Sequence, residues 1–201
     1  MIFVISGPSG CGKSTLVKGV LGDIKDVKFS VSYTTREKKK SEKEGEDYYF
    51  ISIDKFKSMI EDNKFVEWAI VHGNYYGTSR REIEKKGTRN NLLLDIDVQG
   101  AQMARERFKK AIFIFIFPPG FRELKNRLEK RERESQEDIQ RRLIVAQKEI
   151  RSYADFDYII INDKLDAAVW DLKSIIVSQH CRLDLCQKEI IPILRSFSKR
   201  E

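Results

Sequence analysis

The chain has 201 residues, with 38 lysines and arginines against 31 aspartates and glutamates, so its formal net charge is +7. A content of 41% apolar and 34% charged residues is typical of a soluble globular protein, and only four prolines argue against long disordered regions. The positive balance suggests polyanionic partners, either nucleotides or nucleic acid. The basic residues are interleaved with glutamates along the chain, which favours a solvated surface over a dedicated nucleic-acid face.

Cysteine usage and the N-terminal residues bear on the location of the protein. Three cysteines, an odd number, do not make a disulfide framework, and a reducing cytoplasm is the simplest interpretation. The apolar start, MIFVIS, stops at Gly7, which is too short for a signal peptide or a membrane span. We therefore expect a soluble, cytoplasmic protein with no membrane partner.

Short apolar runs alternate with segments of helical period along most of the chain. Residues 2–5 form a continuous apolar run, which is typical of a strand buried on both faces. Similar runs occupy residues 92–94, 111–117 and 158–161. Helical spacing is found at residues 98–108, 121–131, 138–152 and 165–178, and a capping box, Ser135-x-x-Asp138, starts a helix near Glu137. This alternation predicts an α/β fold with a doubly wound parallel sheet.

Two parts of the chain depart from this alternation. Residues 33–88 are rich in aromatic and charged side chains with short alternating runs, and we expect a small, mostly antiparallel insert that carries substrate contacts. The predicted organisation is a core of residues 1–32 and 89–181, the insert, and a helical extension of residues 182–201. In the extension, apolar residues at helical spacing predict a helix packed on the core: Leu183, Cys186, Ile190, Ile191 and Leu194.

A phosphate-binding loop follows the first apolar run. Nine residues satisfy the pattern G-x-x-x-x-G-K-[ST]: Gly7, Pro8, Ser9, Gly10, Cys11, Gly12, Lys13, Ser14 and Thr15. Glycines let successive N–H groups surround a phosphate, Lys13 reaches the β- and γ-phosphates, and the Ser14 hydroxyl binds Mg²⁺. An ordinary glycine-rich turn is the alternative, but a strand before and a helix after favour the ATP site. We interpret Cys11 as a small loop residue and not as a reactive thiol.

The same loop and six further segments resemble the guanylate kinase family, in that family's order, over about residues 1–180. The segments are SVSYTTR, GEDYYF, VEWAIVHGNYYGT, LLLDIDVQGA, RLEKRERES and IIND. The resemblance implies transfer of the ATP γ-phosphoryl group to GMP or dGMP, with Mg²⁺ as cofactor. It also implies a P-loop core, a GMP-binding insert and a helical lid at about residues 127–142.

The resemblance also implies which residues bind GMP. The phosphate contacts fall on Arg36, Tyr48 and Tyr76, and Lys39 stands where the family usually has a second arginine. The guanine contacts fall on Ser32, Glu67, Thr78 and Asp97. A carboxylate can accept both N–H donors of guanine while hydroxyls donate to O6. Without the resemblance, the tyrosines could be packing residues and Glu67 a solvated edge charge.

On the ATP side, the resemblance assigns arginines of the lid to the transferring phosphates. These are Arg127, Arg131 and Arg142, and with Lys13 and Arg36 they form the expected catalytic set. Asp95, after a buried strand, is the expected Mg²⁺ partner of Ser14, although a role in ordering the loop is an alternative. Asn162 matches the position that contacts adenine, or it caps a strand end.

Two further departures from the family concern the lid and one helix. Glu132 replaces a glycine expected after the lid arginine, and residues 84–91 are polar and short, which indicates a brief helix. Three alternatives stay open: a kinase for another phosphorylated acceptor, a non-catalytic module that binds phosphorylated peptides, and a nucleic-acid-dependent ATPase. The intact Lys13-Ser14 pair favours the enzyme, while the oligomeric state is left undetermined.

Overall fold

The computed structural model describes residues 1–87, 91–130 and 135–198. Its centre is a parallel sheet of five strands in the order β2-β7-β1-β8-β9. The strands are β1 (Ile2–Ser6), β2 (Val27–Phe29), β7 (Asn91–Asp95), β8 (Ile112–Phe117) and β9 (Tyr158–Ile161). The predicted α/β fold is confirmed. Only β2 was not expected, because three residues are too few to show a periodicity.

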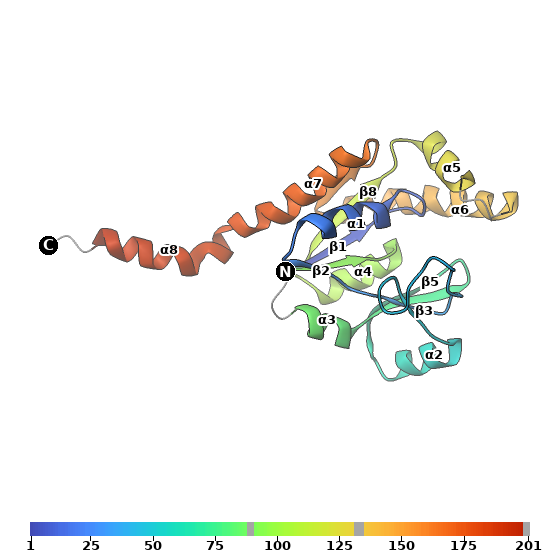
Figure 1. The fold of residues 1–201 in the computed structure, drawn as a ribbon, viewed down its shortest axis with the longest axis horizontal. Helices are drawn as coiled ribbons and strands as arrows, with labels where there is room; N and C mark the ends of the chain where they lie inside the picture. The colour runs from blue at the N-terminus through green and yellow to red at the C-terminus, as the bar shows by residue number, and fades with distance from the viewer. Residues whose placement is uncertain (88–90, 131–134, 199–201) are drawn as a thin grey trace.

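Helices cover both faces of this sheet (Figure 1). On one face, Phe3 and Ile5 pack in a buried cluster with residues of α1 (Lys13–Asp23) and α7 (Leu165–Ser178). On the other face, Val4 packs in a second cluster with α4 (Val98–Arg107). Successive side chains of β1 thus point into two apolar layers, which explains why its sequence is apolar without alternation.

A second sheet is formed by strands in the order β4-β3-β6-β5. They are β3 (Tyr33–Thr34), β4 (Tyr49–Phe50), β5 (Phe65–Val71) and β6 (Asn74–Ser79), with α2 (Ile53–Glu61) and α3 (Arg80–Gly87) beside them. Two of its pairings are antiparallel, and only β3 and β4 are parallel. The β5–β6 hairpin turns through His72 and Gly73, both with positive φ. The proposed boundaries of core and insert stay a prediction.

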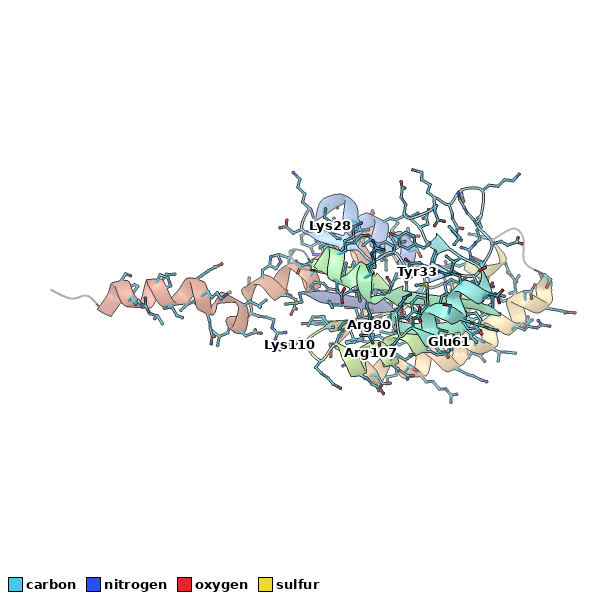
Figure 2. The ribbon with its side chains drawn as sticks, turned by 90° about the horizontal axis from the view of Figure 1, so that it is seen from below. Lys28, Tyr33, Glu61, Arg80, Arg107 and Lys110 are labelled. Carbon is cyan, nitrogen blue, oxygen red and sulfur yellow. The ribbon has the colours of Figure 1, made fainter. Side chains whose placement is uncertain are left out.

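The second sheet is tied to the core through α4. Arg107 Nη1 donates a hydrogen bond to the Phe65 carbonyl of β5 at 2.8 Å, and Arg107 is labelled in Figure 2. A bulge between Phe65 and Glu67 shifts the register of β5 against β6, and Phe65, Val66 and Glu67 are all buried. Bulges re-aim a side chain in this way. The bulge and the α4 contact together set the position of Glu67.

The helical pair that follows β8 lies over the phosphate-binding loop. It comprises α5 (Phe121–Glu129) and α6 (Gln136–Glu149), which share a small buried cluster around Leu128 and Leu143. The Ser135 side chain accepts a hydrogen bond from the Asp138 N–H, so the predicted cap is confirmed. The chain continues as a 3₁₀ helix, η1 (Ile150–Asp155), which ends the predicted helix earlier than expected. Arg131 and Glu132 lie outside the described residues.

The C-terminal helix, α8 (Leu183–Ser198), follows the short 3₁₀ helix η2 (Gln179–Cys181) and does not pack on the core. Figure 1 shows α8, in red, extending away from the body of the molecule, and none of its described side chains is buried. The helix prediction is confirmed, but the expected packing is wrong, because α1, α4 and α7 already cover the faces of the sheet. In the described ranges, no helix is both long and apolar enough to cross a membrane.

Candidate active site

The phosphate-binding loop joins β1 to α1 at the carboxyl end of the central strand. Gly7, Gly10 and Gly12 have φ values of 146°, 89° and 98°, a region that side chains disfavour. A Cβ on Gly7 would lie 2.4 Å from the Ile116 carbonyl oxygen. Lys13 Nζ donates to the Gly7 carbonyl at 2.6 Å, so its ammonium group lies inside the loop. The backbone therefore forms the curled cradle that phosphates require.

Beside the loop, a serine and a carboxylate offer oxygen ligands. The parallel register places Ile5 opposite Asp95, and Ser14 Oγ donates to Asp95 Oδ2 at 3.0 Å. Burial raises the pKa of Asp95, while the charge of Lys13 opposes that rise. Mg²⁺ prefers such hard oxygen donors and takes few of them from the protein when phosphates supply the rest. Ser14 and Asp95 therefore fit a magnesium ion carried by ATP.

The lid side of the loop is held by arginines and an asparagine. Arg127 donates to the Cys11 carbonyl at 3.3 Å and to the Asn162 carbonyl at 3.0 Å, while Asn162 Nδ2 donates to the same Cys11 carbonyl at 2.8 Å. Arg142 Nη2 donates to Ser9 Oγ at 2.6 Å. The structure thus brings two of the predicted arginines and Asn162 to the loop. The thiol of Cys11 is fully buried, and burial raises its pKa.

Glu149, at the end of α6, was not among the predicted site residues. Its Oε2 accepts a hydrogen bond from the Ser9 N–H at 3.3 Å. Burial raises the pKa of Glu149, and the charge of Lys13 counters this rise. In turn, burial works against the charged form of Lys13, but the carboxylates around it, Asp95 and Glu149 among them, contribute to a pKa that is raised overall. No local motif marks a glutamate that reaches the loop from 140 residues away.

A buried polar cluster in the second sheet contains three predicted guanine-binding residues, Ser32, Glu67 and Thr78. Glu67 is 2% exposed and lies opposite Thr78 in the β5–β6 pairing. The hydroxyls of Ser32 and Thr78 are 3.2 Å apart and buried. Burial raises the pKa of Glu67 to about 7; Asp97 adds to the rise and hydrogen bonding from Thr78 opposes it. In the described structure, Glu67 Oε1 has no hydrogen-bond partner, which is costly for a buried polar atom.

Gly100, in the first turn of α4, makes room for this carboxylate. A Cβ built on Gly100 would lie 2.4 Å from Glu67 Oε2. The turn is fixed by Asp97, whose Oδ1 accepts from the N–H groups of Gln99 and Gly100 at 2.7 and 3.0 Å. Asp97 therefore caps a helix and leaves only part of its carboxylate for a ligand. The role of Gly100 was not predicted, although the residue belongs to the family segment LLLDIDVQGA.

Arg36, Tyr48 and Tyr76 form a second polar group on the same sheet. Arg36 is stacked near the Tyr48 ring, 5.6 Å from its centroid, and the two tyrosine rings are 5.8 Å apart. Burial raises the pKa of Tyr48, so its hydroxyl is a neutral donor. The Arg36 guanidinium pairs with Glu42 at 2.7 Å, a contact that the sequence did not indicate because the glutamate lies in a run of alternating charges.

Lys39 is placed differently from the other predicted phosphate ligands. Its side chain is exposed, and its backbone N–H donates to Glu42 Oε2 at 2.9 Å. Glu42 thus joins the backbone of Lys39 to the Arg36 guanidinium. The predicted contact of the Lys39 ammonium group with a phosphate stays a prediction.

Fold and site together define a class of protein. The parallel sheet carries a G-x-x-x-x-G-K-S loop after its first strand, and Ser14 of this loop is hydrogen-bonded to Asp95. These features define a P-loop phosphotransferase.

Comparison with known proteins gives the family. The guanylate kinase family model matches residues 1–179. The guanylate kinase of Geobacter metallireducens is 47% identical over 183 residues, 90% of each chain, and that of Caldanaerobacter subterraneus is 43% identical over 185 residues, 92% of this chain and 90% of the relative. A crystal structure of guanylate kinase from Anaplasma phagocytophilum aligns with a TM-score of 0.76 and 30% identity, over 95% of this chain and 93% of that one. The chain belongs to the guanylate kinase family.

Proposed function

We propose that this enzyme, which phosphorylates GMP with ATP, does so by in-line transfer between the phosphate-binding loop and a base pocket formed by the buried polar cluster of the second sheet. One observation carries the acceptor assignment: a buried carboxylate, Glu67, has an unpartnered oxygen beside two buried hydroxyls. Guanine supplies N1–H and N2–H donors for that carboxylate and an O6 acceptor for Ser32 or Thr78. The same pocket accepts dGMP, because these contacts involve only the base.

Adenine does not match this pocket. It has a lone pair at N1 and no N–H donor there, so it would face Glu67 with repulsion and leave a buried charge unpaired. A site that pairs polar groups in this way can reject the mismatched analogue by about 10⁴-fold. We assign Asp97 a supporting role at the base, since its first oxygen is engaged in capping α4.

The acceptor phosphate is assigned to Arg36, Tyr48 and Tyr76, with Lys39 at the rim. A guanidinium and two neutral hydroxyls supply charge and donors without a general base. None is needed, because the second pKa of a phosphate monoester is about 6 and the nucleophilic oxygen is already ionised at neutral pH. Arg36 would have to exchange its pairing with Glu42 for the incoming phosphate.

We assign the donor phosphates to the loop from Gly7 to Thr15 and to the lid arginines. Ser14 and Asp95 would hold Mg²⁺, which when bound neutralises phosphate charge. Lys13, Arg127 and Arg142 offset the charge that spreads over the moving phosphoryl group, with Arg131 as a further predicted contributor. Asn162 lies against Gly12, within reach of the loop, and is assigned to the adenine side.

We also propose a cytoplasmic location. All three cysteines are free, as is usual in a reducing compartment, and ATP and GMP are intracellular substrates.

A coupled assay tests the acceptor assignment. The purified chain is supplied with ATP, Mg²⁺ and GMP, dGMP, AMP, CMP or UMP in turn. We expect turnover with GMP and dGMP, and a kcat/KM at least about 100-fold lower with AMP. Equal use of AMP and GMP would refute guanine selection by Glu67, although phosphoryl transfer at the P-loop would still stand.

A further inference from the structure

The helix α8 presents an apolar surface that no other element among the described residues covers. Leu183, Ile193 and Phe197 are 70%, 56% and 78% exposed. Figure 2 shows the helix standing clear of the body of the molecule, with side chains on both sides of its ribbon. The helix also lies beyond residue 179, where the match to the family model ends. An exposed apolar surface of this kind on a soluble protein commonly marks an interaction site.

The spacing of these residues indicates which kind of partner fits. One line of apolar residues along α8 has successive separations of three, four, three and four; this line, called the seam below, consists of Leu183, Cys186, Ile190, Ile193 and Phe197. A repeat of seven residues with two apolar positions is the pattern by which two helices pack side by side. Pro192 is two residues from Ile190, about 200° round the helix, so its missing N–H lies away from the seam.

The charges of α8 distinguish a helix partner from a membrane surface. Helices that lie on membranes carry many lysines and arginines on their polar face. The polar positions of α8 instead hold two acidic and two basic residues, which balance: Asp184, Glu189, Lys188 and Arg195. A helix whose charges balance and whose apolar face contains this seam suits another helix of the same kind.

We propose that α8 is a dimerisation helix, which pairs along its seam with α8 of a second copy of this chain. The two surfaces are identical, so the contact is self-complementary and closes with two-fold symmetry. Because α8 extends away from the body, pairing leaves both active sites free (Figure 1). The proposal does not depend on the role assigned to any active-site residue.

The expected strength follows from the size of the contact. A helix of 16 residues is about 24 Å long, so a pair buries less area than the roughly 1,200 Å² found in the smaller stable interfaces. We therefore expect reversible dimerisation, with a dissociation constant on the order of 10 µM.

Sedimentation equilibrium of the full chain, at about 1 to 200 µM, tests the proposal. The mass should rise with concentration from 23.5 kDa towards twice that value. Ile193→Asp places a charge in the seam and should weaken dimerisation at least about tenfold. The matched control is Leu185→Asp, which makes the same change off the seam at a side chain of similar exposure, 49% against 56%. It should shift the dissociation constant less than about twofold.

Two readouts separate pairing from loss of folding and from other partners. Both variants should keep the Tm and the kinase activity of the parent chain, since α8 does not contact the active site. A parent chain that stays monomeric at 200 µM would overturn the proposal, as would equal effects of the two substitutions. Binding of the monomeric parent chain to phosphatidylglycerol vesicles, abolished by Ile193→Asp, would overturn it in favour of a membrane surface.

Discussion

Replacing Glu67 by glutamine removes a carboxyl group whose pKa burial raises to about 7. The ionised carboxylate accepts the two N–H donors of guanine, whereas the protonated acid presents a donor of its own. GMP binding should therefore release a proton from Glu67, and the dissociation constant for GMP should fall as the pH rises through about 7. The glutamine variant retains the shape of the side chain and loses this titration.

The size of the effect follows from the pKa. A carboxyl group with a pKa of about 7 is ionised in about one molecule in eleven at pH 6 and in ten of eleven at pH 8, so Glu67 should strengthen GMP binding about tenfold between these values. The GMP phosphate, with a pKa of about 6, adds a smaller dependence of the same sign. Glu67→Gln should keep only the smaller pH dependence that comes from the GMP phosphate. It should also lower kcat/KM for GMP by a factor equivalent to about 2–4 kcal/mol, because a glutamine N–H then faces a guanine donor.

Calorimetric titration with GMP at pH 6, 7 and 8 measures this dependence. Each titration is run in two buffers of different ionisation enthalpy, so that proton release is counted directly. AMP serves as the control ligand, and its weaker binding should lose little or improve in the variant. An identical pH dependence in the parent chain and the variant, or parallel losses for GMP and AMP, would show that Glu67 is structural.

Three further substitutions address the loop, the helix turn and the phosphate rim. Lys13→Met should lower kcat by about 10³-fold with an unchanged Tm, because it removes the charge beside the moving phosphoryl group; near-normal kcat in the folded variant would place the chemistry elsewhere. Gly100→Ala should raise the KM for GMP about tenfold and leave the KM for ATP unchanged, since the added methyl group must displace Glu67 Oε2; equal rises in both would indicate a general packing defect. Lys39→Arg should lower the KM for GMP a few-fold, which is equivalent to about 1 kcal/mol. Lys39→Ala should raise the KM for GMP, and this rise should become smaller as the salt concentration increases. If neither substitution changes the KM for GMP at low salt, Lys39 does not contact the GMP phosphate.

Several features of this protein followed from local sequence. The continuous apolar runs, the cap at Ser135 and the glycine-rich loop each depend on residues within a few positions of one another, and the structure has the elements where these patterns predicted them. The guanine and phosphate residues came from the family resemblance. Their roles in binding stay predictions, although Glu67, Ser32 and Thr78 lie together and Arg36 lies beside Tyr48.

Other features were decided by contacts between distant parts of the chain. Glu149 reaches the loop at Ser9 because α6 packs over it, and Gly100 matters because the bulge in β5 directs Glu67 towards α4. Neither relation has a periodicity that the sequence could reveal. The direction of α8 is of the same kind: the apolar spacing of residues 183–197 specifies a helix with one apolar seam, which is equally compatible with packing on its own core or on a partner. The choice depends on whether the core has an uncovered face, and here α1, α4 and α7 had already covered the sheet on both sides.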